Sequence, residues 1–384
     1  MSVTLGVLGG GQLGNYFVLA AKNMGYRTAV LDPDPYAPAG VNADSHFIAP
    51  FDDMQALTEL ASLCTAVTVE FENPPVSSLD FLAPFVEVHP SSSCVAIAQN
   101  RKDEKIFCES IGLSVAPYEV LETQKDIERI SRLGVTRTHL DPRRMPLLMK
   151  TSRLGYDGKG QQRIHSLTDI ATLWSNVENV PCVVEQVLPL DAEFSIVLAR
   201  SRTGEVAVFA PTHNVHIDGI LDVSTATTHH TSIETEFFRT GEQAAIRIAH
   251  ELHYVGVLAV EFFISGNKLF VNEIAPRPHN SGHWTIDAAI TSQFEQQVRT
   301  LAGLPLGETT MTHHAVAMVN LLGDVWKNGT PNFQIALEDT AAHLHLYGKS
   351  EATSRRKMGH ITVTGNDLPS VVRHAIDLRT AIVR

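Results

Sequence analysis

Cysteine is scarce in this sequence, and the few cysteines lie far apart. Only four are present, at positions 64, 94, 108 and 182, and none of them forms a CxxC pair. This spacing excludes the usual zinc motifs and gives no basis for a disulfide framework. We therefore expect Cys64, Cys94, Cys108 and Cys182 to be small buried hydrophobic residues in a reducing compartment.

Long apolar runs and an excess of positive charge are also missing. No stretch approaches the roughly 18 uncharged apolar residues of a membrane span, and the N-terminus lacks the sections of a signal peptide. The formal net charge of -12 argues against non-specific binding to nucleic acid. We expect a cytoplasmic protein that binds neither membranes nor nucleic acid.

The strand and helix patterns predict several domains. A chain of 384 residues exceeds the size at which a single core stops growing, so two or three domains are expected. Over the first ~90 residues, apolar runs alternate with helical patterns, which predicts a parallel, doubly wound sheet. Further on, we expect a helix over 238–253, a last long helix over 284–302, and short strands at 315–321, 343–347 and 360–364.

Two glutamates on a predicted β-hairpin form the first candidate site. A three-residue turn, Gly266 to Lys268, would place Glu261 directly opposite Glu273, where like charges repel. Unpaired carboxylates within such apolar strands are costly. A Mg²⁺ ion would remove that cost, because it takes carboxylate oxygens as ligands. The alternative is one solvent-facing glutamate and one salt-bridged glutamate.

A glycine-rich turn near the N-terminus forms the second candidate. Gly9, Gly11 and Gly14 follow the first predicted strand, and Asp32 ends the next one. This spacing fits the dinucleotide fingerprint, in which backbone amides at a helix N-terminus hold a phosphate. Other phosphate-binding turns look the same. An NAD-dependent dehydrogenase is therefore one hypothesis, although nothing after residue 100 is typical of a hydride-transfer site.

A lysine followed by a glycine-rich loop indicates a triphosphate site. Lys150 ends a predicted strand, and the loop from Ser152 to Gly160 contains a second lysine, Lys159. Lys150 would act as a point charge on phosphates, and the loop would close over them and exclude water. The sequence is not a Walker A motif, and a polar loop with solvated lysines is the alternative.

Further polar residues lie where ligands of such folds bind. Glu72 and Asn73 follow a strand of the first sheet, on the same rim as the glycine turn. Glu193 follows a strand-to-loop change and would accept ribose hydroxyls. Basic residues suited to a phosphate come later in the chain, namely Arg277, His279, His283, Lys349 and Arg356. The alternative for each is a solvated or capping group.

The order of these motifs along the chain resembles the ATP-grasp superfamily. Three stretches are similar to the N5-carboxyaminoimidazole ribonucleotide synthase family, namely GGGQLG at 9–14, YDGKG at 156–160 and NEIAPRPHNSGH at 272–283. The tail matches it as well, through YGK at 347–349 and RKMGH at 356–360. The chain departs from the family at Gln186, where a second acid is common, and in a longer, more basic segment over 135–146.

The resemblance implies an α/β and α+β architecture. A Rossmann-like domain over 1–95 would precede the ATP-grasp fold, with its small subdomain over 96–188 and its large subdomain, including a small β-rich C-terminal segment, over 189–384. The implied reaction joins bicarbonate to 5-aminoimidazole ribonucleotide in de novo purine synthesis. ATP is split to ADP and phosphate through carboxyphosphate, and Mg²⁺ neutralises charge during phosphoryl transfer. A homodimer is implied too.

The resemblance also implies roles for individual residues. Glu261 and Glu273 would hold Mg²⁺. ATP contacts would come from Arg101, Lys105, Lys150, Lys159, Glu185, Gln186, Val187, Leu188 and Glu193. The ribonucleotide would contact Gly11, Gln12, Leu13, Glu72, Asn73, Tyr156, His279, Asn280, Lys349 and Arg356. Catalytic roles would fall to Asp157, Arg277 and Lys349.

Two alternatives stand beside the dehydrogenase. A formate-dependent glycinamide ribonucleotide transformylase belongs to the same superfamily and would release ADP with formate in place of bicarbonate. A non-catalytic nucleotide-binding protein would bind ATP without forming phosphate.

Overall fold

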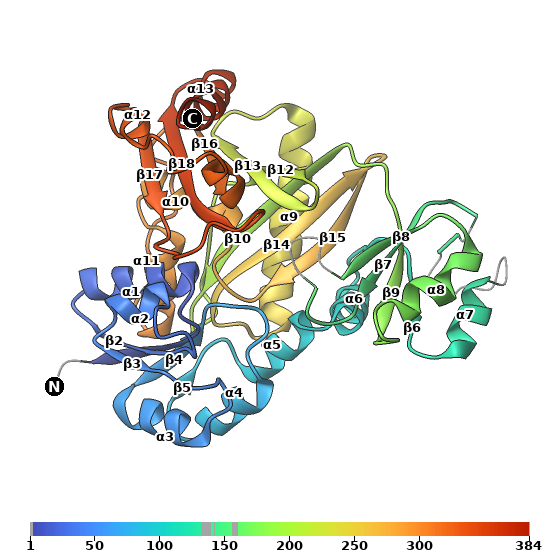
Figure 1. Ribbon diagram of the computed structural model, residues 1–384, viewed down its shortest axis with the longest axis horizontal. Coiled ribbons are helices and arrows are strands. Elements are labelled where there is room, and N and C mark those ends of the chain that lie inside the picture. The colour runs from blue at the N-terminus through green and yellow to red at the C-terminus, as the bar shows by residue number, and fades with distance from the viewer. Residues whose placement is uncertain (1–2, 132–139, 142, 156–159, 384) are drawn as a thin grey trace.

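A computed structural model describes residues 3–131, 140–141, 143–155 and 160–383 of the protein. Within these residues the strands form three sheets, one near the N-terminus, one small sheet to the side and one large central sheet (Figure 1). All four cysteines are free and buried, as the sequence predicts. Among the described residues, no helix is both long enough and apolar enough to span a membrane.

The N-terminal sheet is parallel, as the alternating pattern predicts. Its five strands lie in the order β3-β2-β1-β4-β5, with every neighbouring pair parallel. The strands are β1 (Thr4–Leu8), β2 (Arg27–Leu31), β3 (Ser45–Phe47), β4 (Ala66–Val69) and β5 (Glu87–Val88). The helices between them are α1 (Gln12–Asn23), α2 (Pro38–Asn42), α3 (Met54–Leu63) and α4 (Val76–Leu82). The carboxyl ends of β1 and β4 therefore share one rim.

The stretch after this sheet forms two helices. They are α5 (Ser92–Ala98) and α6 (Arg101–Ser110). The break lies at Asn100, whose side chain caps α6 by accepting a hydrogen bond from the amide of Lys102. The cap places Arg101 in the first turn of α6, beside Glu273 of the predicted hairpin.

The small sheet is antiparallel and has the order β6-β9-β7-β8. Its strands are β6 (Tyr118–Leu121), β7 (Leu147–Thr151), β8 (Gln161–Ile164) and β9 (Cys182–Gln186), with α7 (Gln124–Ser131), η1 (Leu167–Asp169) and α8 (Ile170–Ser175) alongside. It projects away from the other two sheets (Figure 1). Lys150 lies on β7 and Glu185 on the adjacent β9.

The large sheet has nine strands in the described residues. Its main order is β15-β14-β10-β12-β13-β16-β18-β17, and β11 pairs with β10. These strands are β10 (Ala192–Arg200), β11 (Val206–Val208), β12 (Thr212–Ile217), β13 (Ile220–Thr227), β14 (Gly256–Ser265), β15 (Lys268–Ala275), β16 (Ala315–Leu322), β17 (Ala342–Leu346) and β18 (Lys357–Gly365). The strands predicted in the tail are present, and they extend this same sheet.

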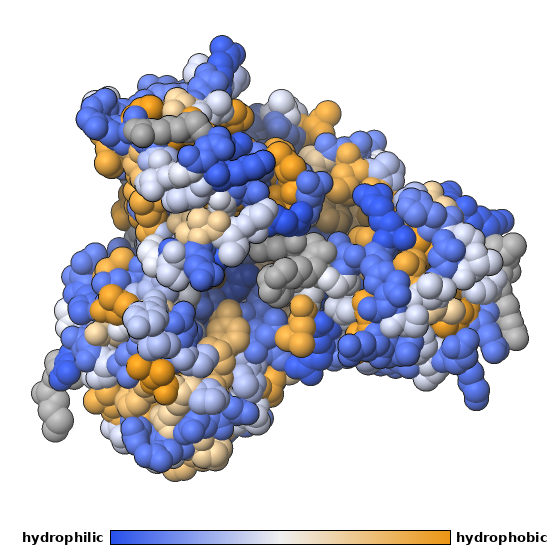
Figure 2. Space-filling view, in the orientation of Figure 1, coloured by the Kyte–Doolittle hydropathy of each residue, from blue (hydrophilic) through white to orange (hydrophobic). Residues whose placement is uncertain are grey.

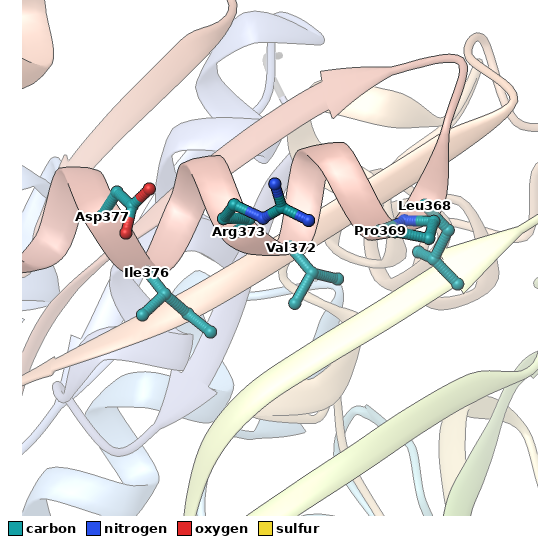
Figure 3. Close-up of a pocket in the computed structure, with 6 residues that line it drawn as sticks. All are labelled: Leu368, Pro369, Val372, Arg373, Ile376 and Asp377. Atoms are coloured by element: carbon teal, nitrogen blue, oxygen red, sulfur yellow. The ribbon is translucent and has the colours of Figure 1, made fainter.

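Helices that pack on the large sheet precede the β14–β15 hairpin in the chain, follow it, and end the chain. They are α9 (Ser232–Glu251), η2 (Asn280–Gly282), α10 (Thr285–Ala288), α11 (Gln293–Leu301), η3 (Gly323–Trp326), α12 (Gln334–Leu337) and α13 (Leu368–Ala381). The sequence analysis did not predict α13. Its inner side is buried against β16 and β18, and its outer side bears Val372, Ile376 and Arg373 around a shallow hollow (Figure 3).

The predicted long helix over 284–302 is wrong, because the chain breaks between α10 and α11. The amides of Ile290 and Thr291 donate to the carbonyls of Thr310 and Glu308, in a tertiary pairing that a continuous helix would forbid. Ser292 then caps the new helix by accepting the amide of Glu295.

Candidate active site

The two glutamates of the hairpin do face each other. Glu261 on β14 pairs with Glu273 on β15. The predicted three-residue turn is wrong, however, because Ser265 pairs with Lys268 and leaves a two-residue turn. Its residues have φ values of 53° and 60°, which glycine and asparagine tolerate. A bulge at Asn272 restores the opposed pair, since Phe262 opposes Val271 while Glu261 opposes Glu273.

The two carboxylates fit the donor set of a hard divalent cation. The Asn272 side-chain amide donates to Glu261 Oε2 at 3.1 Å, and His279 Nε2 lies 3.6 Å from Glu261 Oε1. Arg101 lies 3.6 Å from Glu273 Oε2. Burial, and then the charge of Glu273, raise the pKa of neighbouring Glu104 to about 8. A cation of charge two would relieve this concentration of carboxylates, and Mg²⁺ accepts such oxygen ligands.

A buried cluster of opposite charges lies behind the hairpin. Glu185 receives Lys105 at 2.9 Å on one oxygen and Lys150 at 2.6 Å on the other. The three side chains come from α6, β7 and β9 and are at most 8% exposed. Burial opposes the charge of Glu185, yet the two lysines hold its pKa far below the usual range. Two ammonium groups are thus fixed at one point, as recognition of a polyphosphate requires.

A polar cleft joins these groups to the rim of the N-terminal sheet. Glu72 and Asn73 line it together with Arg101, Glu273 and the loop at 152–155. In Figure 2 the visible face is hollowed between the N-terminal part and the C-terminal strands, and hydrophilic residues line the hollow. The hairpin and the first sheet, far apart in sequence, therefore border one space.

The glycine turn holds carboxylates of the protein itself. Glu70, at the end of β4, accepts the amides of Gly11 at 2.9 Å and Gly14 at 3.0 Å. Asp32 accepts the amide of Gly10 at 2.6 Å. These amides are the groups that a pyrophosphate would need. A β-carbon on Gly11 would lie 2.6 Å from a Glu70 oxygen, so the glycine serves this internal contact. The turn is not a free dinucleotide site.

Gln12, just beyond this turn, reaches the C-terminal part of the chain. Lys349 Nζ donates to Gln12 Oε1 at 2.8 Å and to the carbonyl of Lys357 at 2.7 Å. The Gln12 amide nitrogen lies 3.3 Å from His283 Nε2. Three segments, from the first domain, the stretch after the hairpin and the tail, therefore meet at one glutamine.

A second link joins the first sheet to the stretch after the hairpin. Arg277 forms a short ion pair with Glu72, and both side chains are largely buried. Arg277 also donates to the carbonyl of Pro278 at 2.8 Å. A guanidinium held in this way can offer its remaining donors to an anion.

Known protein families and relatives match nearly the whole chain. Family models match as the ribonucleotide synthetase preATP-grasp domain over residues 1–99, the ATP-grasp domain over 106–294 and the phosphoribosylaminoimidazole carboxylase C-terminal domain over 316–374. The N5-carboxyaminoimidazole ribonucleotide synthase of Brucella melitensis is 41% identical over 94% of this chain and 95% of its own length. That of Bacillus subtilis is 38% identical over 93% and 90%.

The chain belongs to the N5-carboxyaminoimidazole ribonucleotide synthase family.

Solved structures of this family agree in fold. The Thermus thermophilus enzyme superposes with a TM-score of 0.87 at 36% identity, covering 99% of this chain and 98% of that one. The Aspergillus clavatus enzyme, solved in complex with ADP and 5-aminoimidazole ribonucleotide, has a TM-score of 0.84 at 27% identity and covers 99% of each chain. The architecture inferred from the family resemblance is thus confirmed.

The remaining predicted site residues differ in burial and in whether another residue already binds them. Glu193 pairs with His216 of β12 at 2.9 Å, so its carboxylate is already engaged. Gln186 ends β9 and donates to the carbonyl of Arg144. Arg356 is exposed and donates to the carbonyl of Glu351 at 2.9 Å. Val187 and Leu188 are partly buried in the linker to β10, and Leu13 is buried on α1. Tyr156, Asp157 and Lys159 lie outside the described residues.

Sequence reasoning missed two residues that organise the site. Glu70 holds the glycine turn, and its place at the end of β4 beside Glu72 was a usable clue. Gln293 is fully buried and links two histidines: it accepts the amide of His279 at 2.9 Å, and its nitrogen lies 3.2 Å from His283 Nδ1. Nothing local in the sequence indicates the role of Gln293, because its partners come from a preceding loop.

Proposed function

We propose that this chain joins bicarbonate to the exocyclic amine of 5-aminoimidazole ribonucleotide, with ATP split to ADP and phosphate. The observation that carries the proposal is the cleft lined by both Glu273 and Glu72. In this cleft the site of phosphoryl transfer, at Glu273, adjoins the proposed acceptor pocket, at Glu72. Phosphoryl transfer to bicarbonate would give carboxyphosphate, and its CO₂ would reach the amine without crossing bulk water.

The buried lysines serve ATP in this scheme. Lys105 and Lys150 are held by Glu185 before any ligand binds, so their side chains lose little conformational freedom when ATP binds. Arg101, at the start of α6, lies between Glu273 and the loop at 152–155, whose Gly155 carbonyl it contacts at 3.2 Å. Lys159, Gln186, Val187, Leu188 and Glu193 complete the proposed ATP contacts.

Glu261 and Glu273 are the residues that would hold Mg²⁺. When bound, Mg²⁺ neutralises charge on the phosphates during transfer. His279 and Asn280 lie immediately after the hairpin. The side-chain oxygen and nitrogen of Asn280 are both buried without a hydrogen-bond partner among the described residues, so this amide can serve a ligand.

The acceptor pocket would be formed around Gln12 and Arg277. Gly11 and Leu13 flank Gln12, Glu72 and Asn73 would hold the ribose, and Lys349, Arg277 and Arg356 would bind the phosphate. Tyr156 and Asp157 complete the proposal near the imidazole and the transferred carboxyl.

A coupled assay of ADP release tests the activity. We expect ADP formation with ATP, Mg²⁺ and 5-aminoimidazole ribonucleotide to rise on addition of bicarbonate and to stay unchanged on addition of formate. Formate-dependent release with glycinamide ribonucleotide would favour the transformylase. ATP binding without phosphate release would favour a nucleotide-binding protein. Tight NADH binding in a fluorescence titration would revive the dehydrogenase.

Replacing Lys349 by methionine tests the acceptor pocket. The substitution keeps the length of the side chain but removes the ammonium that contacts Gln12. We expect KM for 5-aminoimidazole ribonucleotide to rise by about 10–100-fold, which corresponds to one or two charge-assisted hydrogen bonds. KM for ATP should stay within about twofold. Lys327→Met, at an exposed lysine, is the matched control, and an unchanged KM for the ribonucleotide in Lys349→Met would contradict the assignment.

Three further features belong to the proposal. The division into 1–95, 96–188 and 189–384 is supported by the sheets, each of which lies within one part. A cytoplasmic location and a homodimer stay predictions from the family resemblance. Light scattering of the purified chain tests whether it forms a homodimer.

A further inference from the structure

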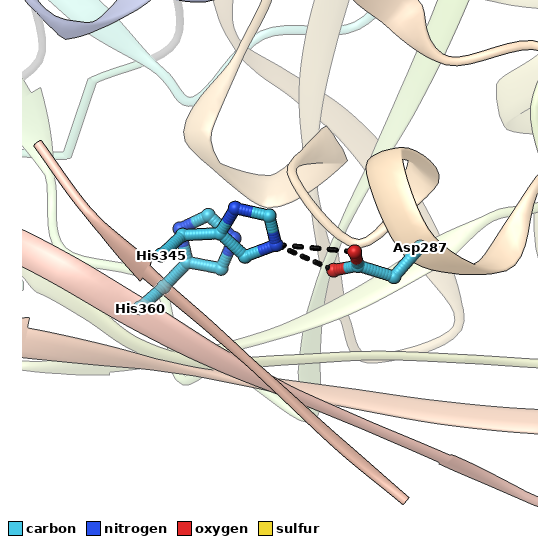
Figure 4. Close-up of side chains that lie close together, drawn as sticks. All are labelled: Asp287, His345 and His360. Atoms are coloured by element: carbon cyan, nitrogen blue, oxygen red, sulfur yellow. Dashed lines mark hydrogen bonds and ion pairs between the residues drawn. The ribbon is translucent and has the colours of Figure 1, made fainter. Parts of the chain in front are cut away.

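A histidine cluster lies where the C-terminal strands meet the stretch after the hairpin. Asp287 comes from α10, His345 from β17 and His360 from β18. His345 Nε2 lies 2.9 and 3.1 Å from the two oxygens of Asp287. The rings of His345 and His360 stack at 4.4 Å between centroids, as Figure 4 shows. One ligand atom from each of the three residues lies within 4.8 Å of the other two.

His360 carries an unused nitrogen in this cluster. The side chain is fully buried, and its Nε2 has no hydrogen-bond partner among the described residues. A buried polar atom without a partner costs free energy. Its other nitrogen, Nδ1, lies 2.9 Å from the hydroxyl of Tyr347. If Nδ1 donates to that hydroxyl, Nε2 keeps a lone pair, the form that a metal ion binds.

We propose that Asp287, His345 and His360 form a second metal site, distinct from the glutamate hairpin, which binds a divalent transition ion such as Zn²⁺. Two imidazole nitrogens and one carboxylate oxygen are ligands typical of Zn²⁺ rather than Mg²⁺. An ion roughly 2 Å from each ligand atom holds those atoms within about 4 Å of one another. The three ligand atoms here lie within 4.8 Å, and the two imidazole planes are 15° from parallel, so binding requires one histidine ring to rotate until both nitrogens face the ion.

The surroundings of the cluster support this assignment. Asp287 is 8% exposed, and its carboxylate pairs with His343 and His345. His343 Nδ1 lies 3.7 Å from an oxygen of Asp287, and its side chain is 47% exposed. His343 therefore lies on the solvent side of the cluster, where an ion would enter. Binding would require His345 Nε2 to give up the proton that it donates to Asp287, and this proton would move to Nδ1 of the same ring or to solvent.

The site would fasten the tail to the rest of the chain. Asp287 lies four positions after His283, which contacts Gln12. Strand β17, which carries His345, leads directly to Lys349, the second partner of Gln12. A bound ion would therefore be structural, and it would steady two of the segments that meet at Gln12.

Titration with Co²⁺ tests the proposal on the full chain. The protein is stripped with EDTA and titrated without ATP or Mg²⁺, and the visible absorption of bound Co²⁺ is followed. We expect one saturable Co²⁺ per chain that Zn²⁺ displaces and excess Mg²⁺ does not. Zn²⁺ should also raise Tm, because it binds only the folded chain. A chain with no saturable binding would overturn the proposal.

Two sets of variants locate the ion. His345→Ala and Asp287→Asn should abolish the Co²⁺ absorption, and Tyr347→Phe, which removes only the partner of Nδ1, should weaken binding by about 10–100-fold. His165→Ala, at an exposed histidine, and Glu273→Gln, in the hairpin, should leave the titration unchanged. Thermal unfolding of the metal-free variants shows that they fold. Wild-type affinity in both folded variants, His345→Ala and Asp287→Asn, would refute the site, as would loss of binding in Glu273→Gln.

Discussion

Replacing Glu273 by glutamine is expected to lower the rate of ADP formation by about a thousandfold while leaving the fold intact. Metal ions contribute several kcal/mol to phosphoryl transfer, and about 4 kcal/mol corresponds to three orders of magnitude. Glutamine keeps the size and one oxygen of the side chain but removes the charge that opposes Glu261 across the hairpin. The measurement is the coupled ADP assay at saturating ATP over a range of Mg²⁺ concentrations.

The control for this prediction is a glutamate with no place in the site. Glu242 is exposed on α9, and Glu242→Gln should retain the wild-type rate. Far-ultraviolet circular dichroism of both variants shows whether the fold is kept. Wild-type turnover by a folded Glu273→Gln protein would remove the hairpin from the metal site and leave the two carboxylates unexplained.

Replacing Glu185 by glutamine is expected to destabilise the protein by about 3–5 kcal/mol, the range found when one partner of a buried ion pair is removed. Lys105 and Lys150 would then be left facing each other at low exposure, with no carboxylate between them. The measurement is the midpoint of urea unfolding at neutral pH. Phosphate or ATP should restore part of the loss, because each supplies the missing negative charge.

The matched control is the exposed pair of Lys102 and Glu122. Its nitrogen and oxygen lie 2.8 Å apart, as close as in the buried cluster, but the side chains are 32% and 38% exposed. Glu122→Gln should cost about 1 kcal/mol or less, because water screens such pairs. Equal losses in Glu122→Gln and Glu185→Gln would contradict the argument from burial.

The effect of Glu185 should also depend on pH in a defined direction. The two lysines lower the pKa of this carboxyl below its ordinary value of 4.5 in the folded chain. Its stabilising contribution is therefore complete above pH 4.5 and is lost as the pH falls further, through the folded-state pKa. The difference between wild type and Glu185→Gln should narrow only under acid conditions.

The hairpin shows how far local reasoning reaches. The apolar strands and the opposed glutamates follow from the sequence, because side-chain alternation and a short turn are local properties. The turn itself was predicted wrongly. A Gly266-Asn267 turn of two residues needs a compensating bulge at Asn272, and neither hydrophobic pattern nor turn residues announce a bulge at a particular position.

The helix predicted over 284–302 failed for a different reason. Its residues have a helical pattern, but the backbone of Ile290 and Thr291 bonds to residues near 309, which no window of local sequence contains. The interpretation of the glycine turn as a dinucleotide site failed for the same reason. The spacing of the turn fits a dinucleotide site, and the carboxylate of Glu70, from a strand far along the chain, occupies the amides instead.

The sequence by itself determined the family, the parallel first sheet and the two hairpin glutamates of the candidate Mg²⁺ site, because these depend on residue types in a fixed order. Only the tertiary structure decided which charges are paired and which atoms are left without a partner. Lys105, Lys150 and Glu185 lie on three elements, and their pairing exists only when those elements pack. The same holds for Asp287, His345 and His360, whose spacing in the chain resembles no metal motif. Electrostatic energy depends on distance and burial, and both are properties of the packed chain.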